Sequence, residues 1–213
     1  MCGIVGYIGK RDAASIVLEG LYRLEYRGYD SAGLATAANG QVDVVRAKGS
    51  VKELESKIDA SHSNRNLAIG HTRWATHGPP SEKNSHPHKS YFEKISIVHN
   101  GIIENYEEIK NELIDCGYKF NSDTDTEVLG SWIELTQSRL DCSLSEAVST
   151  ALNSVVGAYA ICVLEVGKEE IVVARKSSPL AIGIGEFEGS KEFIIGSDAT
   201  PIVSYTDSII CLL

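Results

Sequence analysis

The pattern of apolar and polar positions in the first 50 residues predicts a strand, a helix and a hairpin. Residues 4–8 are apolar and lie between glycines, which favours a buried strand. Apolar side chains then recur over residues 13–24 with the period of a helix, and Asp12 precedes them as a helix N-cap. The dipeptide Asn39-Gly40 is a strong signal for a short hairpin, so we expect two paired strands, at residues 32–37 and 42–46.

The rest of the chain places helices in one block between groups of strands. Strands are predicted at residues 67–72 and 95–98, on either side of a long polar loop. Because hairpin-like pairs in both halves enclose the helices, the order indicates an α+β fold with antiparallel sheet rather than regular βαβ units. No repeat or linker divides the pattern, so we expect a single domain over residues 1–213. Helices are predicted at residues 105–115, 126–139 and 145–153, and the last strands at residues 158–166, 171–174, 181–184, 193–196 and 208–212.

Composition and charge narrow the classes of partner. The chain has 213 residues, of which 43% are hydrophobic and 23% charged, and this is ordinary for a globular protein. A formal charge of −9 without a run of Lys or Arg argues against a nucleic-acid or anionic-membrane partner. The longest apolar stretch, residues 158–164, falls far below the roughly 18 residues of a membrane span. Five cysteines, odd in number and never in a C-x-x-C motif, favour reduced thiols in the cytoplasm.

The first candidate for chemistry is Cys2. If an aminopeptidase removes Met1, the thiol and a free α-amine belong to one residue. An α-amine has an unperturbed pKa of about 7.7–8.0, so near neutral pH it can accept the thiol proton. Cys2 then carries its own base and needs no separate histidine. The alternative is a terminal cysteine without a role, and position alone does not exclude it.

The segment from Gly70 to Gly78 ends a predicted strand with side chains that suit a small polar substrate. Arg73 can bind a carboxylate through two parallel charge-assisted hydrogen bonds. Thr76 and backbone groups can hold other polar atoms, and Trp74 can shield the site. The alternative is a surface loop in which the Arg and Trp side chains stack.

The tripeptide His99-Asn100-Gly101 closes the apolar strand predicted at residues 95–98. The Asn100 amide and the Gly101 N–H can together supply the two donors of an oxyanion hole. Asn-Gly is also the commonest hairpin dipeptide, so a type I′ turn is the alternative.

The acidic segment at residues 122–127 precedes a predicted helix. Thr124 and Glu127 fit a capping box, and the helix dipole favours carboxylates in a first turn. Capping is the structural interpretation. The functional interpretation is that one carboxylate points into a cleft and binds a ligand ammonium.

The histidines do not form a metal-binding pattern. The spacings of His71, His77, His86 and His88 match no standard zinc site, and no cysteine lies nearby. The glycines at 183, 185 and 189 do not open a predicted helix, which argues against a phosphate loop. We therefore expect neither a metal nor a cofactor.

Taken together, these residues resemble the class II glutamine amidotransferase domain, a family of N-terminal-nucleophile hydrolases. The start of the chain would fit any branch of that family. Tyr-Arg-Gly-Tyr-Asp-Ser at 26–31 and Thr-Arg-Trp-Ala-Thr-His at 72–77 are similar to the glucosamine-6-phosphate synthase branch rather than to the purine, asparagine or glutamate synthase branches. The matching stretches are residues 1–6, 24–33, 71–78, 99–105 and 124–127, extended by 177–180 and 197–198.

The resemblance implies a four-layer αββα sandwich of two mainly antiparallel sheets, with Cys2 at the end of a central strand. Cys2 would attack the side-chain amide carbon of L-glutamine, and the Asn100 side chain and Gly101 N–H would hold the oxyanion. Loss of ammonia would leave a γ-glutamyl thioester that water hydrolyses to glutamate. Arg73 would bind the α-carboxylate of glutamine and Asp125 its α-ammonium.

The resemblance also implies supporting positions around the nucleophile. His86 matches a position in a closing loop, without a role that the resemblance specifies. The others are Thr76 and His77 lining the site, Trp74 on the loop that closes over it and excludes water, and Arg27 and Gly28 packed beside the nucleophile.

Partners are likewise implied by the resemblance. Ammonia would serve fructose 6-phosphate, bound by sugar-isomerase domains of the same longer chain, in an enzyme that is a homo-oligomer. The 213 residues would then be the glutaminase domain without those isomerase domains, in keeping with an apolar end at residues 210–213. The alternatives are the glutaminase domain of another class II amidotransferase, an amide hydrolase of the same fold with a larger apolar pocket, and a glutamine-binding domain without turnover.

Overall fold

A computed structural model describes residues 2–212 of the chain. The predicted removal of Met1 lies outside these residues. The named strands pair antiparallel in two sheets, one of seven strands in the order β11-β9-β10-β1-β4-β2-β3 and one of four in the order β5-β6-β7-β8. The seven-stranded sheet contains β1 (Gly3–Ile8), β2 (Ser31–Ala38), β3 (Gln41–Lys48), β4 (Leu67–Arg73), β9 (Ala181–Phe187), β10 (Ser190–Gly196) and β11 (Ile209–Cys211). The four-stranded sheet contains β5 (His88–Lys89), β6 (Ile95–Ile103), β7 (Gly157–Glu165) and β8 (Val172–Lys176).

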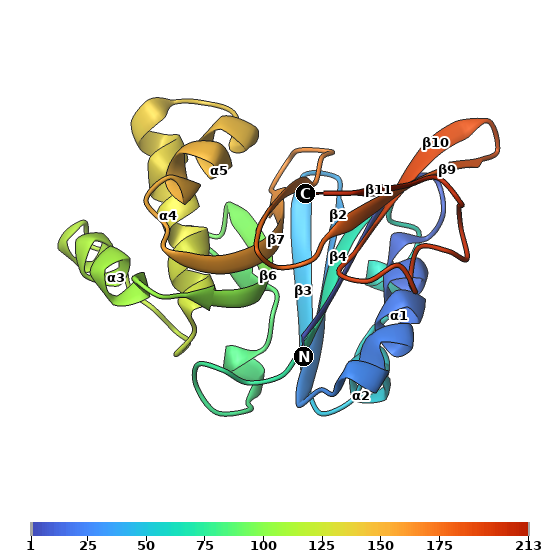
Figure 1. Ribbon diagram of the computed structural model, residues 1–213, viewed down its shortest axis with the longest axis horizontal. Helices are drawn as coiled ribbons and strands as arrows, with labels where there is room; N and C mark the ends of the chain where they lie inside the picture. The colour runs from blue at the N-terminus through green and yellow to red at the C-terminus, as the bar shows by residue number, and fades with distance from the viewer. Residues whose placement is uncertain (1, 213) are drawn as a thin grey trace.

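Helices cover the outer face of each sheet (Figure 1). Two pack on the seven-stranded sheet, α1 (Ala13–Leu24) and α2 (Val51–Glu55). Three cover the four-stranded sheet, α3 (Tyr106–Asp115), α4 (Asp125–Leu140) and α5 (Leu144–Leu152). Single 3₁₀ turns stand at η1 (Glu25–Arg27), η2 (Ala60–His62) and η3 (Glu82–Asn84). Over residues 2–212, none of the helices combines the length and the apolar character that crossing a membrane requires.

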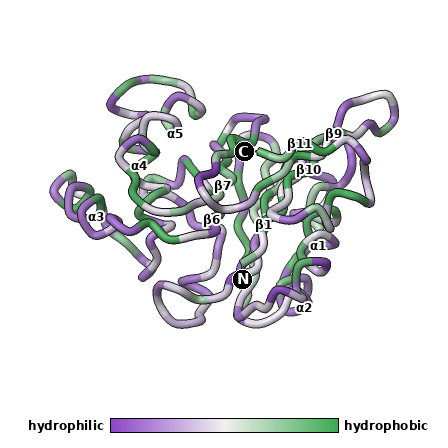
Figure 2. The backbone as a smooth tube through the Cα atoms, viewed as in Figure 1, coloured by the Kyte–Doolittle hydropathy of each residue, from purple (hydrophilic) through white to green (hydrophobic). Residues whose placement is uncertain are grey.

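Three groups of buried side chains separate the four layers. Successive side chains of a strand point to opposite faces, so along β7 Ile161 and Val163 pack under the helices while Cys162 faces the other sheet. On β1, Ile4 points between the sheets and Val5 packs under α1. Figure 2 shows hydrophobic residues following the strands and hydrophilic ones in the outer loops. The predicted α+β fold, with four αββα layers and mainly antiparallel sheets, is therefore confirmed.

Strand β6 is longer than predicted. It continues past residue 98 through Asn100 and Gly101 to Ile103, and Gly101 lies opposite Tyr159 on β7. The type I′ turn that we held as the alternative here is therefore wrong. The neighbouring strand supplies backbone partners along the whole segment, and this pairing outweighs the local turn preference of Asn-Gly.

Other local predictions had mixed outcomes. The Asn39-Gly40 hairpin is confirmed, with φ of 52° and 76° at its two residues. Asp12 precedes α1 as predicted, but its side chain makes no cap hydrogen bond and instead accepts the Asn64 N–H at 3.0 Å. Helix α2 and the two-residue strand β5 were not predicted, because each is too short for a clear hydrophobic period.

Candidate active site

One pocket gathers side chains from both sheets and from the start of α4. Its lining includes residues that the sequence analysis proposed from four separate stretches of the chain. They come from the end of β4 and its following loop, from β6, from α4 and from the residue before β1. The predicted site residues that line it are Cys2, Arg73, Trp74, Thr76, His77, Gly101 and Asp125.

The Cys2 thiol lies where β1 begins, in the middle of the seven-stranded sheet. Its Sγ accepts the Trp74 N–H at 3.2 Å and lies 3.4 Å from the Trp74 carbonyl oxygen. Burial raises the pKa of the Cys2 thiol above its ordinary value, although the Trp74 backbone hydrogen bond and the Arg73 charge oppose that rise. The thiol therefore stays protonated at neutral pH in this setting and needs a base to become a nucleophile.

Asn100 meets Cys2 across the space between the sheets. Alternation along β6 sends Val98 and Asn100 to the face that the seven-stranded sheet covers. Asn100 Nδ2 donates to the Cys2 carbonyl oxygen at 3.3 Å, and Asn100 Oδ1 lies 2.9 Å from His71 Nε2. The amide N–H₂ thus faces the residue that bears the thiol, as an oxyanion donor must.

Gly101 directs its N–H toward the pocket side of β6. The N–H groups two residues before and after it point away from β7: His99 N–H donates to His86 Nδ1 at 3.3 Å, and Ile103 N–H donates to Asp125 Oδ2 at 2.9 Å. In an antiparallel strand, residues two apart direct their N–H groups to the same side. The Gly101 N–H therefore shares that side, where Gly101 itself lines the pocket.

Arg73 ends β4 with its side chain buried, at 3% exposure. Nη2 donates to the carbonyl oxygens of His77 and Gly78, the latter at 3.2 Å. Nη1 is buried without a hydrogen-bond partner among the described residues. A buried guanidinium nitrogen without a partner is costly, so a ligand oxygen on Nη1 would be strongly favoured.

Asp125 is the first residue of α4 and is also 3% exposed. Its Oδ2 accepts the Ile103 N–H at 2.9 Å, and its Oδ1 lies 3.4 Å from the Thr126 hydroxyl. The capping box predicted for this turn is only half formed. Thr124 accepts the Glu127 N–H at 3.3 Å, whereas the Glu127 carboxylate accepts the N–H of Ser122 at 2.7 Å. Helix capping thus falls to Thr124, and Asp125 is left facing the pocket.

The loop after β4 carries Trp74, Thr76 and His77 around the pocket. Asp30 anchors this loop, because its Oδ2 accepts the Ala75 N–H at 2.5 Å. The His77 ring meets Tyr106 edge-on at 5.0 Å, while the Trp74 side chain is 54% exposed. A stacked Arg–Trp pair does not occur, since Arg73 turns inward and Trp74 outward.

Arg27 and Gly28 stand beside the pocket rather than in its lining. Arg27 Nη1 donates to the carbonyl and the hydroxyl oxygens of Ser197, both at 3.2 Å, and the same hydroxyl accepts the Ile4 N–H at 3.0 Å. Gly28 has φ of 86°, and a Cβ there would lie 3.1 Å from the Trp74 ring. Both residues therefore support the backbone around Cys2.

The pocket also contains residues that were not predicted to bind substrate or to take part in catalysis. His86, His99, Thr124 and Thr126 line it as well. Burial lowers the pKa of His86 well below its ordinary value and also lowers the pKa of His99, so both rings are neutral near pH 7. Within residues 2–212, His, Cys, Asp and Glu side chains nowhere gather in a group of three that could hold a metal ion.

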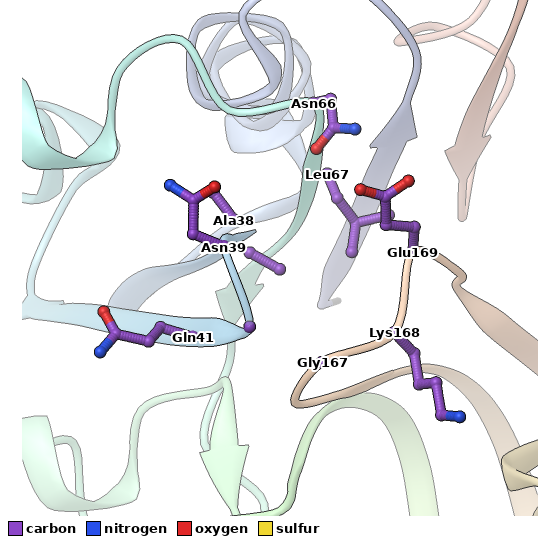
Figure 3. A pocket seen from close by; sticks show the side chains of 10 residues that line it. Ala38, Asn39, Gln41, Asn66, Leu67, Gly167, Lys168 and Glu169 are labelled. Atoms are coloured by element: carbon purple, nitrogen blue, oxygen red, sulfur yellow. The ribbon is translucent and has the colours of Figure 1, made fainter.

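A second polar pocket lies at the far end of the same strands. It is lined by the Asn39-Gly40 turn and by Gly167, Lys168 and Glu169 of the loop between β7 and β8 (Figure 3). Leu67 at this end and Arg73 at the other are separated by six residue steps, roughly 20 Å of strand. None of the predicted site residues lines this pocket.

The chain was compared with known protein families, and the family that matches agrees with the residues that line the pocket. Residues 44–208 match the family described as "Glutamine amidotransferase domain". The chain belongs to the glutamine amidotransferase domain family. Its curated relatives include proteins named glutamine–fructose-6-phosphate aminotransferase (isomerizing). The relative from Bacteroides thetaiotaomicron is 54% identical over 214 residues and that from Chlorobaculum tepidum 50% over 217, each covering 100% of this chain and 34% of the relative.

This amidotransferase domain thus spans about a third of the length of the curated relatives it matches. Among solved structures it is similar to the glutamine phosphoribosylpyrophosphate amidotransferase of B. subtilis, with a TM-score of 0.79 and 26% identity. That alignment covers 99% of this chain and 44% of the other. The identity to the relatives named glutamine–fructose-6-phosphate aminotransferase is higher than the identity to this solved structure. This difference agrees with the resemblance drawn from the stretches at 26–31 and 72–77. The similarity to this solved structure also agrees with the predicted N-terminal-nucleophile hydrolase fold.

Proposed function

We propose that this domain hydrolyses L-glutamine to glutamate and ammonia, with Cys2 as the nucleophile. One observation carries the proposal: a thiol, Gly101 and a buried Arg–Asp pair line a single pocket, and the Asn100 amide reaches the residue that bears the thiol. Arg73 Nη1 and the Asp125 carboxylate supply one positive and one negative group, which suits the α-carboxylate and α-ammonium of an amino acid.

The reaction follows from the position of these groups. Once Met1 is removed, the α-amine of Cys2 accepts the thiol proton, and the thiolate sulfur forms a bond to the side-chain amide carbon of glutamine. The negative charge on the former carbonyl oxygen is stabilised by Asn100 Nδ2 and the Gly101 N–H. Collapse of this intermediate breaks the C–N bond, and the nitrogen leaves as ammonia after taking the proton. Water then adds to the γ-glutamyl thioester and releases glutamate.

We further propose that the ammonia is used to make glucosamine 6-phosphate from fructose 6-phosphate. The names of the relatives and their greater length support a chain in which residues 1–213 form one glutaminase domain and isomerase domains bind the sugar phosphate. A homo-oligomeric enzyme in the cytoplasm completes this proposal, and the five free cysteines suit a reducing compartment.

Glutamate release from glutamine tests the proposed hydrolysis. The protein is first shown by intact mass to lack Met1. We expect turnover by this form and a loss of at least about 10³-fold in Cys2→Ser, with thermal unfolding unchanged. Cys116→Ser is the matched control, because Cys116 lies exposed at the end of α3, and we expect this variant to keep its turnover. Glutamine binding by the processed protein without glutamate release would instead identify a non-catalytic glutamine-binding domain.

A further inference from the structure

Two buried histidines lie behind the Asn100 amide, and the proposed reaction uses neither of them. His71 on β4 and His86 in the loop before β5 stack with ring centroids 4.3 Å apart and an interplanar angle of 24°. Both side chains are shielded from solvent, at 0% and 5% exposure. His71 Nε2 lies 2.9 Å from Asn100 Oδ1, on the side of the amide opposite Cys2.

The surroundings of His71 determine which ring nitrogen carries the proton. Among the described residues Nδ1 makes no hydrogen bond of regular geometry, and the His99 backbone acts on the ring only weakly, so a proton there would be a poorly satisfied donor. Nε2 faces an oxygen, so an unprotonated Nε2 would set two lone pairs against each other. The neutral Nε2–H form avoids both costs. His71 therefore donates a hydrogen bond to Asn100 Oδ1.

That donor fixes the orientation of the amide. If the Asn100 side chain turned by about 180°, its N–H₂ would meet the Nε2–H, donor against donor, and its carbonyl oxygen would face Cys2. An oxygen at that position would repel the oxyanion instead of stabilising it. The His71 hydrogen bond thus favours the only orientation in which Asn100 can act as an oxyanion donor.

His86 keeps the His71 ring and the strand in place. Its Nδ1 accepts the His99 N–H at 3.3 Å, next to Asn100 in the chain. Its carbonyl oxygen packs so closely on β2 that a Cβ on Gly33 would lie 2.0 Å from it. The loop before β5 therefore packs tightly against the seven-stranded sheet, and the His86 ring covers one face of the His71 ring.

We propose that His71 is a positioning residue that holds the Asn100 amide in the oxyanion-binding orientation, with His86 as its support. This inference rests on the proposed glutamine hydrolysis. His71 touches neither the thiol nor the substrate, and it acts only through Asn100.

Three substitutions at position 71 test this role in the Met1-processed protein. His71→Leu removes the donor and is expected to lower kcat for glutamine hydrolysis about 10²-fold, with KM changed less than about threefold. His71→Asn places its amide at the Nδ1 position and should behave like His71→Leu. His71→Gln can place an amide N–H near the Nε2 position and should retain kcat within about tenfold of the wild type. His62→Gln, a histidine at η2 outside the pocket, is the matched control.

A double-mutant cycle with Asn100→Ala separates positioning from general damage. If His71 acts through Asn100, the double variant His71→Leu/Asn100→Ala has the kcat of Asn100→Ala alone, within about threefold. Multiplied losses would overturn the inference, as would an unchanged kcat in His71→Leu. Failure of the proposed function is distinct, because the wild type itself would then release no glutamate.

The tautomer gives a second readout that needs no variant. Nitrogen-15 NMR of the imidazoles in the wild-type protein should show His71 neutral, with the proton on Nε2. A proton on Nδ1 would overturn the inference even if His71→Leu failed to fold.

Discussion

At the scale of single residues, the site depends on groups that the fold leaves without partners or with altered pKa values. The Cys2 thiol has a raised pKa, Arg73 Nη1 has no partner among the described residues, and Asp125 retains lone pairs that face the pocket. Buried polar groups of this kind are rare in native proteins because they cost stability. The glutamine that we propose as substrate would supply the missing partners.

Asp125→Asn should raise KM for glutamine by about 10-fold to 100-fold and change kcat less. Asparagine keeps an oxygen for the Ile103 N–H but loses the charge that we propose binds the α-ammonium, a contact worth roughly 1.5–3 kcal/mol. Steady-state kinetics measure the effect. Asp123→Asn is the matched control, because Asp123 pairs with Lys83 at 2.8 Å outside the pocket, and its KM should not change. An unchanged KM in Asp125→Asn would remove Asp125 from the site.

Single site residues could be predicted from the sequence where they lie in a recognisable motif and where their proposed partner is a near neighbour in the chain or the ligand. Cys2, Arg73 and Asp125 could be picked out in this way. The contact between His71 and Asn100 could not, because these residues are 29 positions apart and lie on strands of different sheets. No local pattern encodes such a contact.

At the scale of elements, β6 is the strand on which the site depends. Its alternation sends Asn100 between the sheets and leaves the Gly101 N–H on the pocket side. The continuation of β6 through Asn100 and Gly101 could not be predicted from the sequence, because the local preference of Asn-Gly is for a turn. Only the partner strand β7, more than 50 residues later in the chain, decides the outcome.

Gly101→Ala should therefore damage both stability and activity. Gly101 has φ of 133°, and a Cβ would lie 2.0 Å from the Ala158 carbonyl oxygen, so the β6–β7 pairing must shift. We expect a loss of about 3 kcal/mol in the free energy of unfolding and at least about 10²-fold in kcat. Urea unfolding and glutamate release measure the two effects.

Gly117→Ala is the control for backbone strain alone. Gly117 has φ of 89°, but among the described residues beyond its chain neighbours no heavy atom lies within 4 Å of its added Cβ. We expect it to lose about 1 kcal/mol and no activity. If Gly101→Ala behaved like Gly117→Ala, the close approach of Gly101 to the Ala158 carbonyl oxygen would not hold the β6–β7 pairing in place.

At the scale of the whole molecule, the packing of the two sheets and of α4 buries a group of histidines. Four of them, His71, His86, His88 and His99, are kept neutral because burial lowers the pKa of each, that of His71 to about 3. Strand alternation and apolar runs predicted the layers correctly. The polar side chains buried between the layers could not be predicted, since histidines scattered along a loop and three strands give no periodic signal.

These buried histidines should make the protein less stable as the pH falls below about 6.5. The unfolded chain binds protons on its histidines near their ordinary pKa, whereas the folded chain does not, so stability present above that pKa is lost as the pH falls toward the folded pKa. Each histidine contributes up to about 1.4 kcal/mol per pH unit. Calorimetry near pH 5.5 should find roughly three to four protons taken up on unfolding, and about one fewer in His71→Leu. Uptake of less than one proton would contradict this account.

The central claim is that Cys2 carries the γ-glutamyl group during turnover. The most direct measurement is mass spectrometry of the N-terminal peptide after the Met1-processed protein is mixed with glutamine and quenched in acid. We expect a transient adduct on Cys2 with the mass of glutamine less ammonia, which disappears as glutamate accumulates. Glutamate release with the adduct on another residue, or continued release by Cys2→Ala, would contradict it.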